Sequence, residues 1–265
     1  MKRHTAMLDT YLKPGAGRLR TLVLAIYPLV LVAIVWQVVS SLGLVRPLFL
    51  PMLSVVLTEL WQLIQSGELF ALLWTSMFRA ISGVALAAVA GIAIGFLCSE
   101  YRLLRWVCEP FVAFGFPLPK IALIPVFTVW FGIGDVSKIV LVFATCVFPF
   151  IVAAQAGADR IPTKLRWAAQ SMGTRNSDMF RHVILPATLP SLFTGLRIAL
   201  PIGLITVFTA EMVTGGGLGE AIVLAQRYFQ SAQVYALVLV TMLVGYLMDV
   251  GIVRAQRRLL SWAEA

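Results

Sequence analysis

Four uncharged runs of 20 or more residues constrain this chain more than any other feature of its sequence. They cover residues 21–45, 80–99, 139–158 and 228–248. About 20 apolar residues in a helix are enough to cross the hydrocarbon core of a bilayer. Two further apolar segments, roughly 106–131 and 191–212, contain single charges or prolines. The pattern predicts an all-α, polytopic membrane protein with six transmembrane helices.

Basic residues are unevenly distributed along the chain, which has a net charge of +9. Most Lys and Arg lie in four segments: before residue 22, at 99–105, at 158–190 and after residue 253. The three intervening segments carry one each: Arg46, Lys138 and Arg227. Basic residues concentrate in the cytoplasmic loops of membrane proteins. Both termini and the segment 158–190 are therefore predicted to be cytoplasmic, and the positive charge requires no nucleic-acid partner.

This topology divides the chain into five parts. They are a cytoplasmic N-terminal tail (1–21), a first transmembrane helix (22–45), a periplasmic segment (46–69), a core of five helices (70–255) and a cytoplasmic C-terminal tail (256–265). A cleaved signal peptide is the alternative for the first apolar run, because basic residues precede it and small residues follow it. Its uncharged stretch exceeds the roughly 7–15 apolar residues of a signal peptide. We interpret it as a retained anchor helix.

Residues suited to catalysis or metal binding are scarce. His4 and His182 lie outside the apolar runs, and the three cysteines show neither disulfide nor metal-site spacing. The glycine-rich segment 213–219 lacks the following Lys-Ser/Thr pair of a phosphate-binding loop. The sequence predicts no enzyme active site, metal site or ATP site in this chain.

Small residues recur at every fourth position in two of the predicted spans. They are Gly83, Ala87, Gly91 and Gly95 in one span, and Gly195, Ala199 and Gly203 in the other. Such stripes let a neighbouring helix backbone approach closely. Both spans are therefore expected to pack tightly inside the bundle.

Several charged residues lie at or near membrane depth, where each suggests a functional hypothesis. Lys120 lies among Pro117, Pro119 and Pro125, which predict a helix break that lines a translocation path; a packing kink with a snorkelling lysine is the alternative. Glu211 precedes the glycine-rich turn and is a candidate gate or partner contact, or an ordinary interfacial carboxylate. For Arg79 and Glu109 a structural role at an interface is favoured, and Arg197 is expected to reach the cytoplasmic side.

The segment 158–190 is unusually organised for a membrane loop. Leu165, Ala168, Ala169 and Met172 recur at helical spacing and predict one apolar helix face. Gly173 permits a turn, residues 176–178 supply capping side chains for a second helix, and Pro186 and Pro190 mark where the next span starts. The helix is a candidate docking surface for another protein; a connector resting on its own bundle is the alternative.

The same loop resembles a known family. Ala168-Ala169, Gly173 and Val183-Ile184-Leu185-Pro186 are similar to the EAA-x3-G-x9-I-x-L-P motif of permease subunits of binding-protein-dependent ABC importers. The resemblance extends over about 50–255, and within the family it is to the nitrate, sulfonate and taurine branch. Its other blocks are Leu50-Pro51, Gly67, Ser76, Arg79 and Gly83; Pro119, Ala122-Leu123, Pro125 and Trp130-Phe131-Gly132; and Glu211 with the following glycines. Trp167 occupies the motif's glutamate position, which removes the usual carboxylate contact.

The resemblance implies an importer in the bacterial inner membrane with several subunits. Two permease copies, expected as a homodimer, form the channel, and an external solute-binding protein (periplasmic or a lipoprotein) delivers the solute. A dimer of cytoplasmic ATPases binds ATP and Mg and docks on a coupling helix at about 163–173. The docking residues implied are Lys164, Leu165, Arg166, Trp167, Ala168, Ala169, Met172, Gly173, Leu185 and Pro186. The pore or gate candidates are Pro119, Lys120, Pro125 and Glu211.

The solute implied by this branch is a small anion such as an alkanesulfonate, taurine or nitrate. A pyrimidine, riboflavin or an aromatic carboxylate is the alternative cargo. A secondary carrier is a further alternative for the whole chain, but it would favour several buried carboxylates in mid-span, whereas the carboxylates here lie near span ends.

Overall fold

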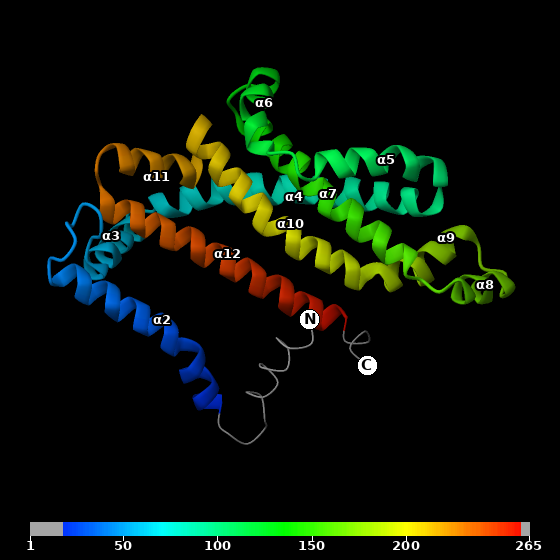
Figure 1. Ribbon diagram of the computed structural model, residues 1–265, viewed down its shortest axis with the longest axis horizontal. Coiled ribbons are helices and arrows are strands. Elements are labelled where there is room, and N and C mark those ends of the chain that lie inside the picture. Colours follow the sequence, from blue (N-terminus) through cyan, green and yellow to red (C-terminus); the bar gives the residue numbers. More distant parts are fainter. Residues whose placement is uncertain (1–17, 261–265) are drawn as a thin grey trace. The chain divides into compact units, whose positions relative to one another are not determined.

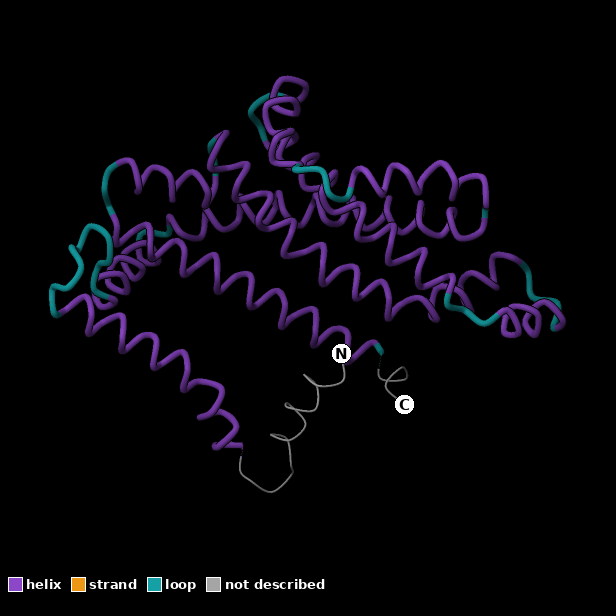
Figure 2. The backbone as a smooth tube through the Cα atoms, in the orientation of Figure 1, coloured by secondary structure: helices purple, strands orange, loops and turns teal. Residues whose placement is uncertain are grey.

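The computed structural model describes residues 18–260, without the side chains of residues 18–25, Arg166, Asn176 and Ser177. All secondary structure within this range is helical (Figure 2), which confirms the all-α prediction. In chain order, and as labelled in Figure 1, the elements are α2 (Arg18–Ser41), α3 (Leu53–Gln65), α4 (Glu68–Glu100), α5 (Arg102–Gly115), η1 (Lys120–Leu123), α6 (Ile124–Phe131), α7 (Asp135–Asp159), α8 (Thr163–Ser171), α9 (Asn176–Met179), η2 (Phe180–Ile184), α10 (Leu185–Thr214), α11 (Gly217–Arg227) and α12 (Ser231–Leu259).

Four described helical stretches are long and apolar enough to cross a membrane. They are α4, α7, the run Phe180–Thr214 and α12. The pair Arg102–Gly115 and Lys120–Phe131, bent by 94°, counts as a fifth if it is one broken span. Ile26–Ser41, the part of α2 whose side chains the structure describes, is also apolar. The structure thus supports a polytopic helical protein, and the sixth span stays a prediction.

The described chain divides into two compact units. The smaller comprises the described residues up to Leu63 together with Ala225–Ala236. In it, Trp36 donates a hydrogen bond from Nε1 to the Pro51 carbonyl at 2.9 Å and packs against the Tyr235 ring at 5.3 Å between centroids. The Tyr235 hydroxyl donates to the Phe49 carbonyl at 2.7 Å. These contacts join α2, the segment before α3 and the start of α12.

The larger unit, Ile64–Leu224 with the described residues from Leu237 onward, is built on α4, α7 and α10. Most of its core side chains are small or medium-sized, among them Ala87, Val142, Cys146, Ala199 and Val207, and these pack around the larger Phe150. Burial of these side chains against each other leaves no room for a larger residue, so the three helices are closely packed.

The stripes of small residues explain this close packing. A Cβ at Gly91 would lie 2.7 Å from the Val147 carbonyl oxygen, and one at Gly95 would lie 2.6 Å from that of Ile151, so α4 approaches the backbone of α7 directly. On α10, a Cβ at Gly203 would lie 2.8 Å from Val84 of α4. The predicted tight packing of both spans is confirmed, because only glycine fits these contacts.

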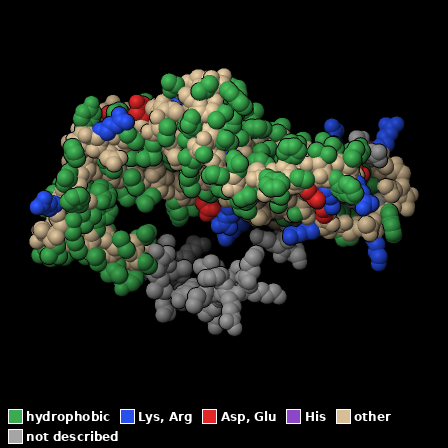
Figure 3. All heavy atoms as spheres, turned by 45° about the horizontal axis from the view of Figure 1, so that its top comes forward, with side chains coloured by type: hydrophobic (Ala, Val, Ile, Leu, Met, Phe, Trp, Pro, Cys, Tyr) green, Lys and Arg blue, Asp and Glu red, His purple; other side chains and the backbone are tan. Residues whose placement is uncertain are grey.

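The outer surface of the described helices is strongly apolar (Figure 3). Exposed aromatic and aliphatic side chains occur along α4 and α5, and α5 buries none of its residues. Contact between water and so much apolar surface is unfavourable, whereas contact with lipid or a partner subunit is not.

The start of the fifth predicted span differs from the expectation. The helical run is continuous from Asn176 to Thr214, passing through the π-helical turn η2. Pro186 is the second residue of α10, directly after this π-helical turn, and Pro190 lies further inside the helix. Pro190 therefore does not mark the helix start, because membrane helices tolerate an internal proline when neighbouring groups satisfy the freed carbonyl.

Candidate functional site

The loop that links α7 to α10 projects a short helix at one end of the larger unit (Figure 1). Helix α8 begins after Pro162 and ends at Ser171. Trp167 is 64% exposed and Met172 is 78% exposed. In Figure 3, Lys and Arg side chains gather at this end of the unit. The loop therefore presents large apolar side chains within a basic surround.

Gly173 ends α8 with a defined backbone geometry. Its φ is +74°, its N–H donates to the Gln170 carbonyl at 2.9 Å, and the next N–H, of Thr174, donates to the Ala169 carbonyl at 3.2 Å. This pair of bonds is the Schellman motif of helix C-termini. A Cβ at Gly173 would meet no atom within 4 Å. Glycine is therefore required here for its left-handed backbone and not for space.

The predicted apolar face of α8 is divided. Ala169 is buried, whereas Leu165 and Met172 are exposed. Trp167 is exposed as well. The predicted apolar face is therefore only partly exposed, and the Thr174 hydroxyl donates to the Ala169 carbonyl at 2.6 Å.

The remaining docking candidates lie around this helix. Lys164 and Ala168 are exposed, and Leu185 and Pro186 are half-buried at the start of α10. The side chain of Arg166 lies outside the described part of the chain. Docking itself stays a prediction for all of these residues.

Two contacts anchor the loop end of the core. The Nη2 of Arg105 in α5 donates to both carboxylate oxygens of Asp159, at 2.6 and 2.7 Å, at the end of α7. Phe180 of η2 packs edge-on against Phe96 of α4 at 5.0 Å between ring centroids. Both contacts tie the segments that flank α8 to the transmembrane core.

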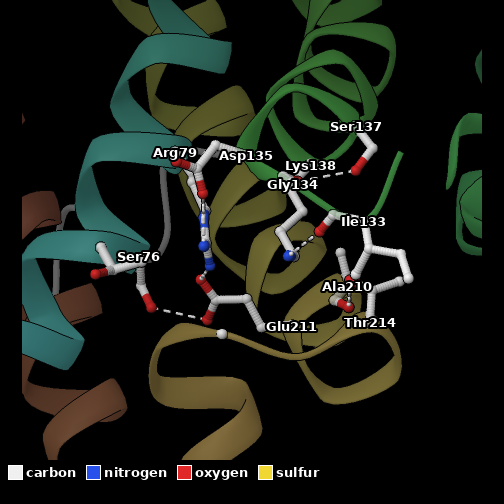
Figure 4. Close-up of polar contacts among 12 residues, drawn as sticks. Ser76, Arg79, Ile133, Gly134, Asp135, Ser137, Lys138, Ala210, Glu211 and Thr214 are labelled. Atoms are coloured by element: carbon white, nitrogen blue, oxygen red, sulfur yellow. Dashed lines mark hydrogen bonds and ion pairs between the residues drawn. The ribbon is translucent and has the colours of Figure 1, made fainter. Parts of the chain in front are cut away.

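A charge network that is buried except for its one exposed carboxylate, Asp135, lies at the opposite end of the larger unit, where α10 ends and α11 begins (Figure 1). It consists of Ser76 and Arg79 of α4, Asp135 of α7 and Glu211 of α10 (Figure 4). The Arg79 guanidinium lies between the two carboxylates, 2.8 Å from Oε1 of Glu211 and 2.6 Å from Oδ1 of Asp135. The Ser76 hydroxyl donates to Oε2 of Glu211 at 2.7 Å. One ion-pair cluster therefore joins all three core helices.

The glycine turn after α10 wraps around this network. The N–H of Leu218 donates to the Ser76 hydroxyl oxygen at 2.9 Å, and the N–H of Gly219 donates to Oε2 of Glu211 at 3.1 Å. The Glu211 carboxylate thus satisfies the first turn of α11, where unpaired N–H groups favour a negative charge. Gly217 has φ +72°, and a Cβ there would overlap both Glu211 and Ser76. The turn needs glycine for its backbone and for space.

Lys138 lies beside the network on α7 (Figure 4). Its side chain is almost fully buried and Nζ donates to the Ile133 carbonyl at 3.1 Å. In the sequence, Lys138 is notable only as the one basic residue of a predicted external segment. In the structure it is a second buried cation near the same carboxylates.

Sequence reasoning treated these charges one at a time. Arg79 was expected to reach an interface, but the structure buries it and pairs it with Glu211. Asp135 was not considered, and Arg197, expected to reach the cytoplasmic side, pairs with Asp249 at 3.0 Å. The sequence does contain a signal for such pairing, because opposite charges occur at matching depths of neighbouring predicted spans. A gate role for Glu211 stays a prediction, and it requires this network to open.

The third predicted span is broken as expected. Helix α5 ends at Gly115, and after the prolines the chain turns into η1 and α6, bent by 94°. Pro119 precedes η1, whereas Pro125 lies in the first turn of α6. Pro125 therefore starts a helix and does not interrupt one, since a first-turn proline loses no hydrogen bond. Lys120 lies at the bend and donates from Nζ to the Phe116 carbonyl at 2.5 Å.

Among the described residues, no three His, Cys, Asp or Glu side chains are grouped so that they could hold a metal ion.

Comparisons with known proteins agree with the loop and the fold. A match to the family described as binding-protein-dependent transport system inner membrane component covers residues 87–261. The chain is 32% identical to the taurine transport system permease protein TauC of Escherichia coli (strain K12), over 92% of this chain and 90% of that protein. It is 32% identical to the putative aliphatic sulfonates transport permease protein SsuC of Bacillus subtilis (strain 168), over 94% and 91%. Identity to the nitrate import permease protein NrtB of Leptolyngbya laminosa is 31%, over 73% of each chain.

A solved structure has the same fold. The match is to an inward-facing structure of the MetNI methionine ABC transporter, with a TM-score of 0.64, 22% sequence identity, and coverage of 72% of this chain and 95% of that chain. With the relatives and the matched residues, this places the chain in the binding-protein-dependent ABC permease family of inner membrane components.

Proposed function

We propose that this permease carries a small anion across the inner membrane and is driven by a separate ATPase dimer that docks on α8. In this proposal two copies of the chain form the channel, both termini lie in the cytoplasm, and ATP and Mg bind only to the partner. A solute-binding protein delivers the cargo to the end of the core that holds the charge network.

The exposed residues of α8 are the observation that supports docking most strongly. Trp167 and Met172 are more than half exposed at the end of a rigid core. Aromatic residues and methionine are enriched at protein interfaces. Because Trp167 stands at the glutamate position of the family motif, we propose that its ring fills an apolar pocket of the ATPase.

The connection from α8 to the core suits force transmission. From Asn176 the chain is helical without interruption to Thr214, and the α8 side of this run is held by the Schellman turn at Gly173. In this proposal, a displacement of α8 is passed through this run to α10. Nucleotide binding to the ATPase would shift the balance between two permease conformations through this contact, provided that the nucleotide-bound ATPase has a higher affinity for one of them.

The anion class follows from the relatives. Their names specify taurine, aliphatic sulfonates and nitrate. All three contain an anionic group. A pyrimidine, riboflavin or an aromatic carboxylate remains the alternative cargo.

The docking proposal is tested at Gly173. Replacing Gly173 with Val should abolish ATP-driven uptake and ATPase co-purification, because a β-branched residue strongly disfavours φ +74°. Gly173→Asn is the matched control, because asparagine tolerates the left-handed region. Insertion into the membrane should be normal for both variants. Normal uptake in Gly173→Val, or uptake that persists without any ATPase, would refute the proposal.

A further inference from the structure

A cavity of about 240 Å³ lies beside the break between α5 and η1. Its walls come from the bend and from two core helices, α7 and α10. The polar lining residues are Lys120, Thr145 and Thr206, and the apolar ones include Phe116, Pro149 and Ile205. All of these segments lie within the membrane-spanning part of the chain. The cavity is therefore a place where a solute would meet side chains at membrane depth.

Lys120 differs from Arg79 and Arg197 in its partners. Arg79 pairs with Glu211, and Arg197 pairs with Asp249. In the part of the chain that the structure describes, Lys120 forms no ion pair with a carboxylate. Its Nζ bonds the Phe116 carbonyl and lies 5.6 and 5.2 Å from the ring centroids of Phe116 and Phe148. Neutral partners of this kind leave the positive charge uncompensated, which is costly at membrane depth.

The ammonium group of Lys120 also has donors to spare. An ammonium carries three N–H donors, and the Phe116 carbonyl accepts one of them. The two threonines of the cavity have none to offer, because Thr145 donates its hydroxyl proton to the Leu141 carbonyl and Thr206 donates to that of Ile202. Lys120 is therefore the cavity's source of both positive charge and hydrogen-bond donors.

The remaining wall of the cavity is hydrocarbon. Pro149, Ile202 and Ile205 face the same space as Lys120. A bare inorganic anion would leave these apolar surfaces uncovered, whereas a short alkyl chain would cover them. The lining therefore combines one cation with an apolar wall.

We infer that this cavity is a binding site for a small organic anion, whose charged group contacts Nζ of Lys120 and whose hydrocarbon part packs on Ile202 and Ile205. The inference rests on the proposed transport of an anion and narrows it to amphiphilic anions, such as alkanesulfonates, in preference to nitrate. The site is a contact along the path and not the source of the energy for transport.

The charge is tested by thiol labelling of the full-length chain in membranes. Ile205→Cys places a thiol on the cavity wall at a position where isoleucine is 61% exposed. The rates of reaction with anionic 2-sulfonatoethyl methanethiosulfonate and cationic 2-(trimethylammonium)ethyl methanethiosulfonate are compared, with the chain lacking this cysteine as background. The anionic-to-cationic rate ratio should fall about tenfold when Lys120→Gln is added, and Lys120→Arg should preserve it.

The matched control is Ile198→Cys, on the same helix, which lines a neighbouring cavity that shares Phe116 and Pro149 but not Lys120. The anionic-to-cationic rate ratio at Ile198→Cys should not change when Lys120→Gln is added. Unchanged labelling rates at Ile198→Cys also show that the protein with Lys120→Gln folds. An unchanged ratio at Ile205→Cys would overturn the inference. Ile121 also lines the cavity, and failure of both Ile205→Cys and Ile121→Cys to react would overturn the inference as well, because the cavity would then be inaccessible.

The amphiphilic character is tested by protection. Millimolar 1-propanesulfonate should slow the reaction of Ile205→Cys with neutral methyl methanethiosulfonate more than equimolar nitrate does, and only while Lys120 is present. Equal protection by nitrate would refute the preference for organic anions. These readouts need no ATPase, so the two proposals can fail separately. Normal uptake in Gly173→Val together with Lys120-dependent labelling would refute only the docking proposal. Loss of uptake in Gly173→Val together with labelling that does not depend on Lys120 would refute only the cavity inference.

Discussion

Glycine turns end a helix at both ends of the larger unit, but for different reasons. Gly173 needs only its left-handed backbone, and open space surrounds it. Gly217 needs the same kind of backbone and also the absence of a side chain, because Glu211 and Ser76 occupy the space beside it. The first turn presents a helix to the outside, whereas the second closes over buried charges. Similar local chemistry therefore serves an exposed contact at one end and internal cohesion at the other.

The strongest way to break this contrast is to remove the centre of the charge network. Arg79→Met should destabilise the protein by about 3–5 kcal/mol, because it leaves the buried Glu211 carboxylate without its cation. The measurement is thermal unfolding in detergent. Arg197→Met is the control: its ion pair with Asp249 is partly exposed, with side chains 55% and 39% accessible, and should be worth less than about 1 kcal/mol. Equal losses would mean that the network is no more cohesive than an exposed pair.

The two turns are compared directly by the same substitution. Gly217→Ala should cost about 2–3 kcal/mol, from backbone strain together with overlap against Glu211 and Ser76. Gly173→Ala should cost about 1–2 kcal/mol, from the backbone alone. Thermal unfolding of the two variants, side by side, measures the difference. A larger loss at Gly173 would contradict the distinction between the turns.

The exposed end is tested by an effect on docking without one on stability. Trp167→Ala should weaken ATPase binding about tenfold and leave the unfolding temperature unchanged, because the ring is 64% exposed. Trp74→Ala is the matched control, since this tryptophan of α4 is 75% exposed and lies outside the loop. Binding is measured by titrating the purified ATPase onto each variant. Loss of binding in both variants, or in neither, would remove Trp167 from the docking surface.

Much of the fold follows from local patterns. The apolar runs predict helices, the small-residue stripes predict close packing, and the prolines around Lys120 predict a break, all of which the structure contains. These features depend on hydropathy and backbone freedom, which neighbouring residues set. The position of Pro190 inside α10 is the exception, because the same residue type either starts a helix or is tolerated within one.

The candidate sites were predictable to different degrees. The loop helix and its turn were visible in the spacing around Gly173, because the helix period and the glycine lie in one short segment. The cavity beside Lys120 was visible only as a lysine among prolines. Its threonines and isoleucines come from α7 and α10, and the sequence contains nothing that brings them together.

By itself the sequence determined the helical, membrane-spanning class, the organised loop with its glycine turn and the family resemblance. Only the tertiary structure decided which charges meet. Arg79 and Glu211 are 132 positions apart, and each has several opposite charges as possible partners along the chain. The choice among them depends on how α4, α7 and α10 pack, which places Asp135, Arg79 and Glu211 at one depth. The physical reason is that hydropathy acts through nearest neighbours in the chain, whereas an ion pair depends on the three-dimensional distance between side chains.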